Sequence, residues 1–377
     1  MLPGRRYAPR VSRVVRPLPN GPPLRVLHLP VNVASLMAST VRGLRELGVD
    51  ARGVALFGAN PVVADDGIAV LSTASSRRSV RWAIDMLREF PRLLSEIRCA
   101  DILHWYMTPG LPFDADVALA RAFGKPAIVE FVGGDIRKPS IEAIDNPYYV
   151  GALPEYEYRT WETDANSDRA QRRFAAAGAE VLVSCPSLLP YLDKGLFAHP
   201  HVVRQRIVTS DFRPVFPDPT KQRPLVVHAT TAPVAKGTGA VLAAVESLKE
   251  QHDFEFVLLR GVSREDALRT IQAADIYLDQ FVLGAHGAAA LEAMALGTPV
   301  VGWIKPAVAR EYPADLPLVC AKPEELAAVV SELLTDGERR ARLGRESRAY
   351  VEAHHDAARL GRELLAVYDE VIRRRRS

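Results

Sequence analysis

Residues 284–301, with the sequence GAHGAAALEAMALGTPVV, combine residue types that could bind a phosphate group and a sugar hydroxyl together. The glycines allow a tight loop, the alanine-rich run favours a helix, and the final valines favour a buried strand. The start of such a helix carries free N–H groups and a partial positive charge, so Gly287 and Ala288 would face an anion. Glu292, about one turn further along, suits hydroxyl groups better than phosphate. The segment therefore indicates a nucleotide or nucleotide-sugar site, with an alanine-rich core helix as the alternative.

A lysine that could neutralise phosphate lies in the segment HATTAPVAKGT, residues 228–238. Lys236 follows an expected buried strand and precedes a helix, so its ammonium group could act as a compact charge on phosphate. Thr230 and Thr231 could donate from hydroxyls in the same loop. Arg260, at the end of the next strand, could stack on a base or reach phosphate. The alternatives are an exposed lysine and a solvated loop arginine; beside the glycine-rich segment, phosphate contact is favoured for Lys236.

Three further segments could contact a hydroxyl-bearing substrate. Asp135 follows a buried strand, and Gly134 beside it permits close backbone approach. A turn-capping aspartate is the alternative there. His104 ends another strand and could be an acid, a base or a hydroxyl ligand, with a packed histidine as the alternative. Asp279 and Gln280 follow a strand directly and are expected to line the ligand site, or else to cap the local structure.

Several common catalytic patterns are missing from the sequence. The first strand–helix unit opens with PVNVAS, residues 30–35, in place of a Gly-x-Gly-x-x-Gly pattern, which argues against a dehydrogenase. The chain has neither a Walker-type lysine loop nor a His-Glu-x-x-His pattern, and no cluster of side chains has metal-ligand spacing. The sequence therefore predicts neither a bound metal nor a cofactor.

Short apolar runs alternate with helical patterns along the chain and would position these residues. Such alternation predicts an α/β fold of two Rossmann-like, doubly wound domains, whose ligands bind in the cleft at the carboxyl ends of the strands. A proline-rich stretch at 200–224 is expected to link the domains. A short strand is expected at 202–208, before the linker proper. We expect a basic disordered tail, an acceptor domain, a donor domain and a final helix at residues 1–23, 24–208, 209–355 and 356–377. The other strands are expected at 24–29, 49–57, 102–105, 127–131, 181–183, 225–229, 254–259, 276–278 and from 300 onward.

Composition narrows the class of protein. Lys and Arg number 48 against 45 Asp and Glu, so no overall field favours nucleic acid as a partner. The basic termini could give a weak peripheral contact with an anionic membrane, although solvated tails are the simpler interpretation. No apolar run approaches the ~20 residues that span a bilayer. The three cysteines form neither a disulfide framework nor a zinc pattern, which favours a reduced, cytoplasmic protein.

The second half resembles a known family. Lys236-Gly237, Ala274-Asp275 and EAMALGTPVV from Glu292 occur in the order and spacing of the nucleotide-binding half of GT-B retaining glycosyltransferases of family 4. Asp279-Gln280 before the glycine loop is similar to one subgroup of that family. The first half agrees more loosely, through Asn32-Val-Ala and the segments ADILH, GGDIR and NPYY at residues 100–104, 133–137 and 146–149.

The resemblance implies a nucleotide-sugar donor held by the second domain, an acceptor held by the first, and no bound metal. Glu292 would bind ribose hydroxyls, while Lys236 and the N–H groups of Gly287 and Ala288 would hold the diphosphate. His286 and Asn32 join the substrate-binding candidates on the same basis. The last helix, residues 357–373, would pack back on the first domain.

The sequence departs from the family pattern at three places. The first glutamate of the family's Glu-x7-Glu pair would stand at Gly284, and the family's histidine before Gly133 is replaced by Val132. An arginine often found just before the phosphate lysine is also missing. The nucleotide contacts therefore match the family better than the sugar and acceptor contacts do.

Taken together, these features predict transfer of a sugar from a UDP-sugar, or a GDP-sugar, to a hydroxyl acceptor in glycan, glycolipid or natural-product biosynthesis. The anomeric configuration would be retained and UDP released. Lys236, Asp135 and His104 are the candidate catalytic residues. The alternatives are a GT-B sugar-nucleotide epimerase, a pseudo-glycosyltransferase that joins non-sugar units, and a nucleotide-sugar-binding protein without catalysis.

Overall fold

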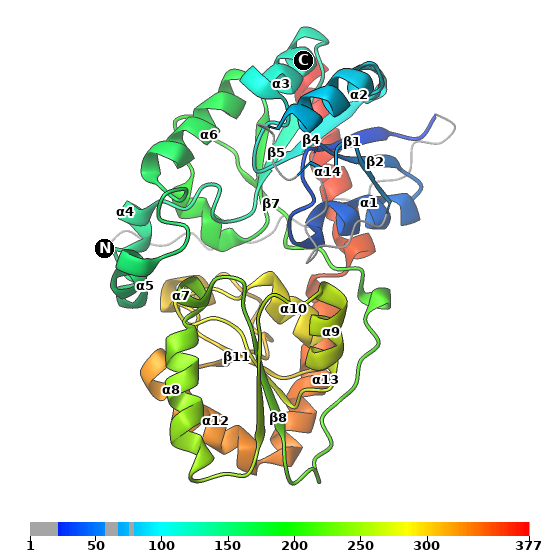
Figure 1. Ribbon diagram of the computed structural model, residues 1–377. Helices are drawn as coiled ribbons and strands as arrows, with labels where there is room; N and C mark the ends of the chain where they lie inside the picture. The colour runs from blue at the N-terminus through cyan, green and yellow to red at the C-terminus, as the bar shows by residue number, and fades with distance from the viewer. Residues whose placement is uncertain (1–21, 57–66, 75–78, 377) are drawn as a thin grey trace.

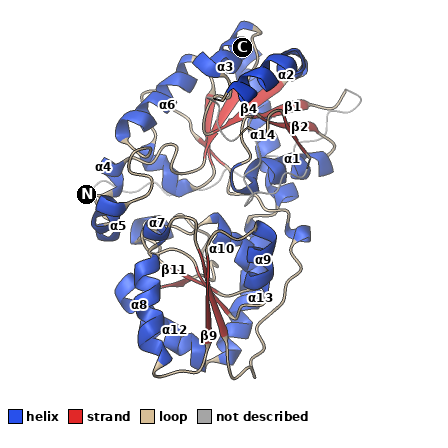
Figure 2. Ribbon diagram, viewed as in Figure 1, coloured by secondary structure: helices blue, strands red, loops and turns tan. Residues whose placement is uncertain are grey.

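The computed structural model describes residues 22–56, 67–74 and 79–376 and contains two parallel sheets flanked by helices (Figures 1 and 2). This arrangement is the predicted α/β fold. The basic N-terminal tail lies almost entirely outside the described residues. So does the end of the strand expected at 49–57, whose described part is a strand over Asp50–Ala55.

The first sheet has, among the described residues, the strand order β3-β2-β1-β4-β5-β6-β7, with every pair parallel. Buried apolar residues cover both faces of its central strands, which explains why these strands appear in the sequence as short continuous apolar runs. The strands are β1 Arg25–Leu29, β2 Asp50–Ala55, β3 Ile68–Val70, β4 Ile102–Tyr106, β5 Ala127–Phe131, β6 Glu180–Val183 and β7 His201–Val202. The helices around it are α1 Leu36–Glu46, α2 Val80–Cys99, α3 Ala115–Ala122, α4 Pro139–Glu142, α5 Pro147–Ala152 and α6 Asp164–Ala176.

The second sheet has the order β12-β11-β10-β8-β9 in the described part of the chain and is also parallel. Its core fills with side chains from both faces, including Val226, Ile276, Leu278 and Val301. The strands are β8 Leu225–Ala229, β9 Glu255–Leu259, β10 Ile276–Leu278, β11 Val300–Gly302 and β12 Val319–Cys320. The helices are α7 Pro233–Lys236, α8 Thr238–Lys249, α9 Arg264–Gln272, α10 Ala288–Ala295, α11 Pro306–Ala309, α12 Leu326–Thr335 and α13 Gly337–His354.

One predicted strand is wrong in extent, and two edge strands were not predicted. The strand expected at 202–208 is limited to β7, His201–Val202, because the chain beyond it leaves the sheet to cross to the second domain. The edge strands β3 and β12 have three and two residues, too few to give a periodic pattern.

The last helix, α14 (Ala357–Arg376), returns to the first sheet and packs along α1 (Figure 1). Its buried side chains Leu360, Leu364, Tyr368 and Val371 join the apolar core beneath that sheet. The contact is close at Gly43 of α1, where an added methyl group would lie 2.4 Å from the Ala357 carbonyl oxygen. The absence of a side chain at Gly43 therefore allows the start of α14 to pack closely against α1.

The chain crosses between the two sheets twice, and the crossings lie side by side. The Ile207 N–H donates to the His355 carbonyl at 2.8 Å, and the Ala357 N–H donates to the Ile207 carbonyl at 2.9 Å. The carboxyl-end loops of both sheets face each other next to these crossings (Figure 1). Side chains also bridge the two halves directly. The Asn146 amide donates to the Val282 carbonyl at 2.8 Å, and the Lys305 ammonium lies 3.1 Å from the Glu142 carboxylate.

Candidate active site

A cavity of about 190 Å³ lies between the start of α1 on one side and α9 and α10 on the other. Ala34 and Ser35 line it from the first domain, Arg206 from the crossing segment, and Glu292 from α10. Ala288, the first residue of α10, also faces it. Because these segments follow the carboxyl ends of strands in both sheets, the cavity occupies the position where open α/β sheets bind ligands.

Lys236, Gly287 and Asp279 form one contact group at the start of α10. The Asp279 side chain is fully buried and accepts from the Gly287 N–H at 2.7 Å, while the Lys236 ammonium lies 3.1 Å from its other oxygen. A methyl group at Gly287 would stand 2.7 Å from the Lys236 nitrogen, so the ammonium in this position occupies the space that a side chain at residue 287 would take. The structure therefore brings together three residues selected from sequence.

One detail of the predicted phosphate contact differs in the structure. The Gly287 N–H is already donated to Asp279, so it is not free for a ligand in this conformation. Gly287 is the N-cap of α10, and the next N–H groups along the helix, beginning with that of Ala288, are the ones that a helix leaves without internal partners. The cationic character at this point therefore comes from Lys236 and the first turn of α10.

Glu292 lies in the wall of the cavity and is paired with an arginine that sequence reasoning did not select. The Arg264 guanidinium nitrogen Nη2 lies 2.7 Å from Glu292 Oε1, and the two side chains are 24% and 20% exposed. Burial raises the pKa of Glu292, and the charge and hydrogen bond of Arg264 oppose that rise. Arg260, the arginine selected from sequence, lies exposed in the loop before α9. The only sequence signal for Arg264 was its position at the start of a helix.

The other candidate residues of the second domain differ in their contacts and exposure. The Thr230 hydroxyl accepts from the Ala232 N–H at 3.1 Å and shapes its own turn, whereas Thr231 is exposed. The Gln280 amide donates to the Ala285 carbonyl and fixes the glycine-rich loop. His286 is part of that loop, and neither of its buried ring nitrogens has a hydrogen-bond partner among the described residues.

The first-domain wall of the cavity is built on a strained turn. Ala34 and Ser35 have φ angles of 45° and 60°, in the left-handed region that non-glycine residues rarely adopt. The Asn32 side chain accepts from the Ala38 N–H at 3.1 Å and ties this turn to α1. Asn32 thus supports the wall from behind, since it is only 8% exposed. Such strain is concentrated at ligand sites in many proteins.

Asp135 and Gly134 stand in a tight turn after β5. The Asp135 carboxylate accepts from the Val132 and Gly133 N–H groups at 3.1 Å and 2.7 Å, so it caps the turn. Burial raises the pKa of Asp135 to about 6, and these backbone donors partly counter the rise. A methyl group at Gly134 would lie 2.3 Å from Glu162 Oε1. The group that closely approaches this glycine is therefore the Glu162 side chain of the protein itself.

His104 lies away from the cavity, inside the first domain. It has no exposed surface, and its Nδ1 lies 2.7 Å from the Tyr368 hydroxyl of α14 while Nε2 lies 3.1 Å from Glu130. Glu130 also binds the buried guanidinium of Arg206, 2.6 Å from Oε1. Burial lowers the pKa of His104 and favours its neutral form. This geometry does not fit the acceptor contact expected for His104; it fits the packed histidine.

Gly284, where the family pattern has a glutamate, has its side-chain space filled by Lys305. The glycine has a φ of 63°, and a methyl group on it would lie 2.1 Å from Lys305 Cγ. The Lys305 ammonium is held 3.1 Å from both Glu142 and Asp145 of the first domain. A longer residue at 284 is therefore excluded by a lysine that bridges the two domains.

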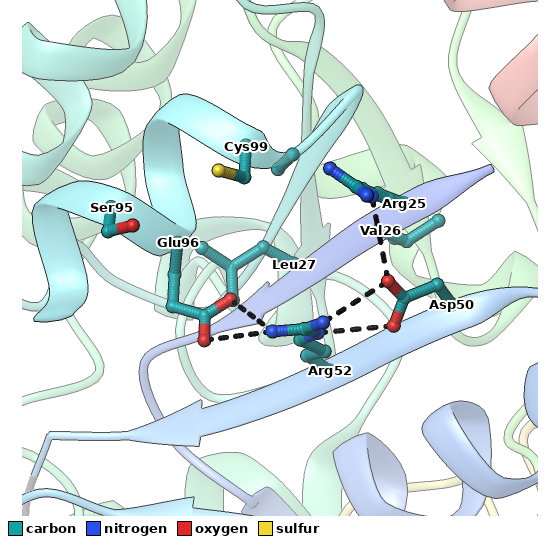
Figure 3. A pocket seen from close by; sticks show the side chains of 9 residues that line it. Arg25, Val26, Leu27, Asp50, Arg52, Ser95, Glu96 and Cys99 are labelled. Atoms are coloured by element: carbon teal, nitrogen blue, oxygen red, sulfur yellow. Dashed lines mark hydrogen bonds and ion pairs between the residues drawn. The ribbon is translucent and has the colours of Figure 1, made fainter. Parts of the chain in front are cut away.

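A second hollow, of about 140 Å³, lies at the opposite edge of the first sheet (Figure 3). Arg25 and Asp50, which line it, begin β1 and β2, so it faces the amino ends of the strands. Arg52 extends between Asp50 and Glu96 and lies 3.1 Å from each carboxylate. The arginine and the two carboxylates thus form ion pairs with one another. None of the site residues predicted from the sequence lines this hollow.

Within the described residues, no group of three or more His, Cys, Asp or Glu side chains is placed to hold a metal ion. In the same part of the chain, no helix has the length and apolar character that crossing a membrane requires.

Comparison with known proteins agrees with this architecture. Residues 234–350 match the family model of glycosyl transferases group 1. A glycosyltransferase from Rickettsia africae superposes with a TM-score of 0.60 at 13% identity, covering 93% of this chain and 99% of its own. HepE (Alr3699) of Anabaena, crystallised with UDP and glucose, gives 0.60 at 11% identity, covering 92% and 99%. A trehalose-6-phosphate synthase, from a study of glycosyl transfer with retention, gives 0.56 at 13%, covering 92% and 98%. No curated protein matches the chain by sequence.

The fold and the matched segment define the class of protein: this is a glycosyltransferase with the GT-B fold. Residues 234–350, which match the model of glycosyl transferases group 1, contain Lys236, Asp279 and Glu292. The predicted fold and enzyme class are thereby confirmed, whereas the subgroup with Asp-Gln before the glycine loop stays a prediction.

Proposed function

We propose that the protein transfers a sugar from a UDP-sugar to a hydroxyl acceptor with retention of the anomeric configuration. The observation that carries the proposal is the placement of Lys236 beside the start of α10, whose residues Ala288 and Glu292 line the cavity. A cation and helix N-terminus suit a diphosphate, and the partly buried carboxylate of Glu292, one turn into the helix, suits the ribose hydroxyls. The structural relatives described as binding UDP, or as acting with retention, support this choice of donor and outcome.

The proposed roles assign the donor to the second domain, residues 209–355, and the acceptor to the first, residues 24–208. Glu292 accepts hydrogen bonds from the ribose, and Lys236 with the Ala288 N–H stabilises the diphosphate. Asp135, near the carboxyl end of β5, stays our candidate for an acceptor contact. We assign the positive charge at the diphosphate to the chain's own groups and give no role to a metal or cofactor.

The proposed mechanism is attack on the same face from which the diphosphate leaves. The acceptor oxygen bonds to the anomeric carbon as the bond to the diphosphate oxygen breaks, and the acceptor proton passes to that leaving oxygen. The protein would contribute by holding both substrates in position and by stabilising the charge that develops on the departing phosphate. Lys236 is the residue best placed for the second task.

A Lys236→Ala variant tests this assignment. We expect UDP release from UDP-sugars in the presence of acceptors to fall by roughly 100-fold or more, as when one charge-stabilising group is removed from an active site. Thermal stability should also fall, because the fully buried Asp279 carboxylate loses its cation while it keeps the Gly287 N–H, so turnover is compared at a temperature where the variant is folded. Lys249→Ala is the matched control, because Lys249 is an exposed lysine on α8 that pairs with Glu246. Equal turnover in both variants would contradict the assignment.

A nucleotide-sugar-binding protein without catalysis is the second candidate, favoured by the occupied space at Gly284. The two functions differ in one measurement. A transferase releases UDP when an acceptor is present, whereas a binding protein raises its melting temperature with the nucleotide sugar and releases none. Proton NMR of the product then tests retention, which an inverted anomeric configuration would rule out.

A further inference from the structure

The Arg264–Glu292 pair has a geometry that the proposed donor contacts do not yet explain. Arg264 is the first residue of α9, directly after Ser263, whose hydroxyl accepts from the Asp266 N–H at 3.1 Å and caps the helix. From there the guanidinium reaches Glu292 on α10, a helix 24 residues further along the chain, at 2.7 Å. Both side chains line the same cavity.

Arg264 is held in place independently of any ligand. Its guanidinium carbon lies 6.0 Å from the ring centre of Phe212, a residue that is 6% exposed and belongs to the segment that connects the domains. A cation over an aromatic face is attracted by the ring, and the ring also restricts the arginine to one side. The helix cap at Ser263 fixes the backbone of Arg264, and the Phe212 ring fixes its guanidinium group.

The pairing affects only one of the two Glu292 oxygens. Oε1 accepts from Arg264, whereas the described residues provide no hydrogen bond to Oε2. A carboxylate that is anchored by one oxygen and ionised has the other oxygen fixed in direction, which is what recognition of a hydroxyl group requires. Free rotation of Glu292 would instead impose an entropic cost on each binding event.

We infer that Arg264 is a positioning residue of the donor site, which orients Glu292 so that its second carboxylate oxygen meets the ribose hydroxyls of the nucleotide. The inference rests on the proposed function. Arg264 thereby acts on the substrate through Glu292 and has no direct part in the chemistry.

The charge state of Glu292 depends on the same pair. Burial raises the pKa of Glu292 and Arg264 opposes that rise, so loss of the guanidinium moves protonation to higher pH. Tyr277 of β10 also interacts with the Glu292 charge. Across the cavity, Arg42 pairs with Asp211, and Arg206 pairs with Glu130, so these cations are largely compensated.

The test compares the binding of UDP and of 2′,3′-dideoxy-UDP by calorimetry from pH 5 to pH 8. The native protein should prefer UDP, and Glu292→Gln should lose most of that preference. Arg264→Met should weaken UDP by about tenfold, a typical value for one hydrogen bond to a charged group, and leave dideoxy-UDP nearly unchanged. As the pH falls, Arg264→Met should begin to lose affinity for UDP at a higher pH than the native protein does. Arg264→Lys should restore part of the preference for UDP over 2′,3′-dideoxy-UDP.

A matched control lies on the same helix. Arg269 is exposed and pairs with Glu265 and Asp266, so Arg269→Met should bind both nucleotides as the native protein does. An Arg264→Met variant that keeps the native preference, binds UDP more tightly, or loses both nucleotides equally would overturn the inference. The first of these results, an unchanged preference for UDP, would contradict the role of Arg264 without contradicting the proposed donor site. A native protein that binds neither nucleotide would instead contradict the proposed UDP donor, and the inference with it.

Discussion

At the scale of single residues, this site depends on glycines and charges that fit each other closely. The Lys236 ammonium lies against Gly287, and Lys305 occupies the space beside Gly284, whose φ of 63° also favours glycine. The two glycines of the loop therefore serve different purposes. One lets a cation reach the start of α10, and the other admits a lysine that connects the donor domain to the acceptor domain.

The consequence for Gly284 is measurable. Gly284→Ala places a methyl group 2.1 Å from Lys305 Cγ, so we expect a loss of about 1–3 kcal/mol beyond the cost of the left-handed backbone. Gly124→Ala is the control: its φ is 65°, close to the 63° of Gly284, but nothing lies within 4 Å of the added methyl. Urea unfolding of the two variants gives the difference. Equal losses would show that Lys305 yields without cost.

The sequence anticipated the placement of the proposed donor residues better than that of the proposed acceptor residues, for a physical reason. Lys236, Gly287 and Glu292 each lie in a local strand–loop–helix pattern, so their placement near the ends of the strands could be predicted. Their roles stay predictions that rest on the family resemblance. Arg264 meets Glu292 only because α9 packs against α10, and His104 is buried only because Tyr368 returns to it 264 residues later. Such contacts depend on tertiary packing, which residue spacing does not reveal.

At the scale of elements, the same rule separates the predicted strands from the missed ones. The central strands are buried on both faces and therefore appear as short apolar runs, as in Leu225 to Val227 of β8. The edge strand β12, with two residues, has too few positions for a pattern, and β7 ends early where the chain leaves the sheet.

The last helix, α14, gives a second prediction. Leu364 is fully buried between α14 and α1, whereas its neighbour Leu365 is only partly buried. Leu364→Ala should cost about 2–5 kcal/mol of unfolding free energy, since a large buried side chain is removed from a packed core. Leu365→Ala should cost clearly less. Urea unfolding measures both, and equal costs would mean that α14 does not pack against α1 in solution as the structure describes.

At the scale of the whole molecule, buried neutral histidines tie stability to pH. Burial lowers the pKa of His28, His104, His228 and His286, and it lowers that of His355 to about 3. In the unfolded chain each would titrate near 6.5. Below that pH the unfolded state binds more protons than the native state, so stability is complete above about pH 6.5 and declines as the pH falls.

His355 alone should account for about 1.6 kcal/mol between pH 6.5 and pH 5, since the full slope of about 1.36 kcal/mol per pH unit is reached only well below the unfolded-state pKa. Its Nδ1 donates to the Gln205 carbonyl at 2.8 Å, beside the paired crossings. We expect urea midpoints to fall over this range, and His355→Asn to fall less steeply than the native protein while starting lower. A slope unchanged by the substitution would show that His355 does not titrate on unfolding.

The paired crossings at Ile207 and Ala357 also have a consequence for synthesis on the ribosome. The donor domain is an insertion within the acceptor domain, because residues before 207 and after 357 both belong to the first fold. The face of α1 that receives Leu360, Leu364 and Tyr368 therefore stays uncovered until the ribosome has passed α14. The second domain can finish folding first, while the first domain keeps an exposed apolar surface until the residues of α14 have been translated.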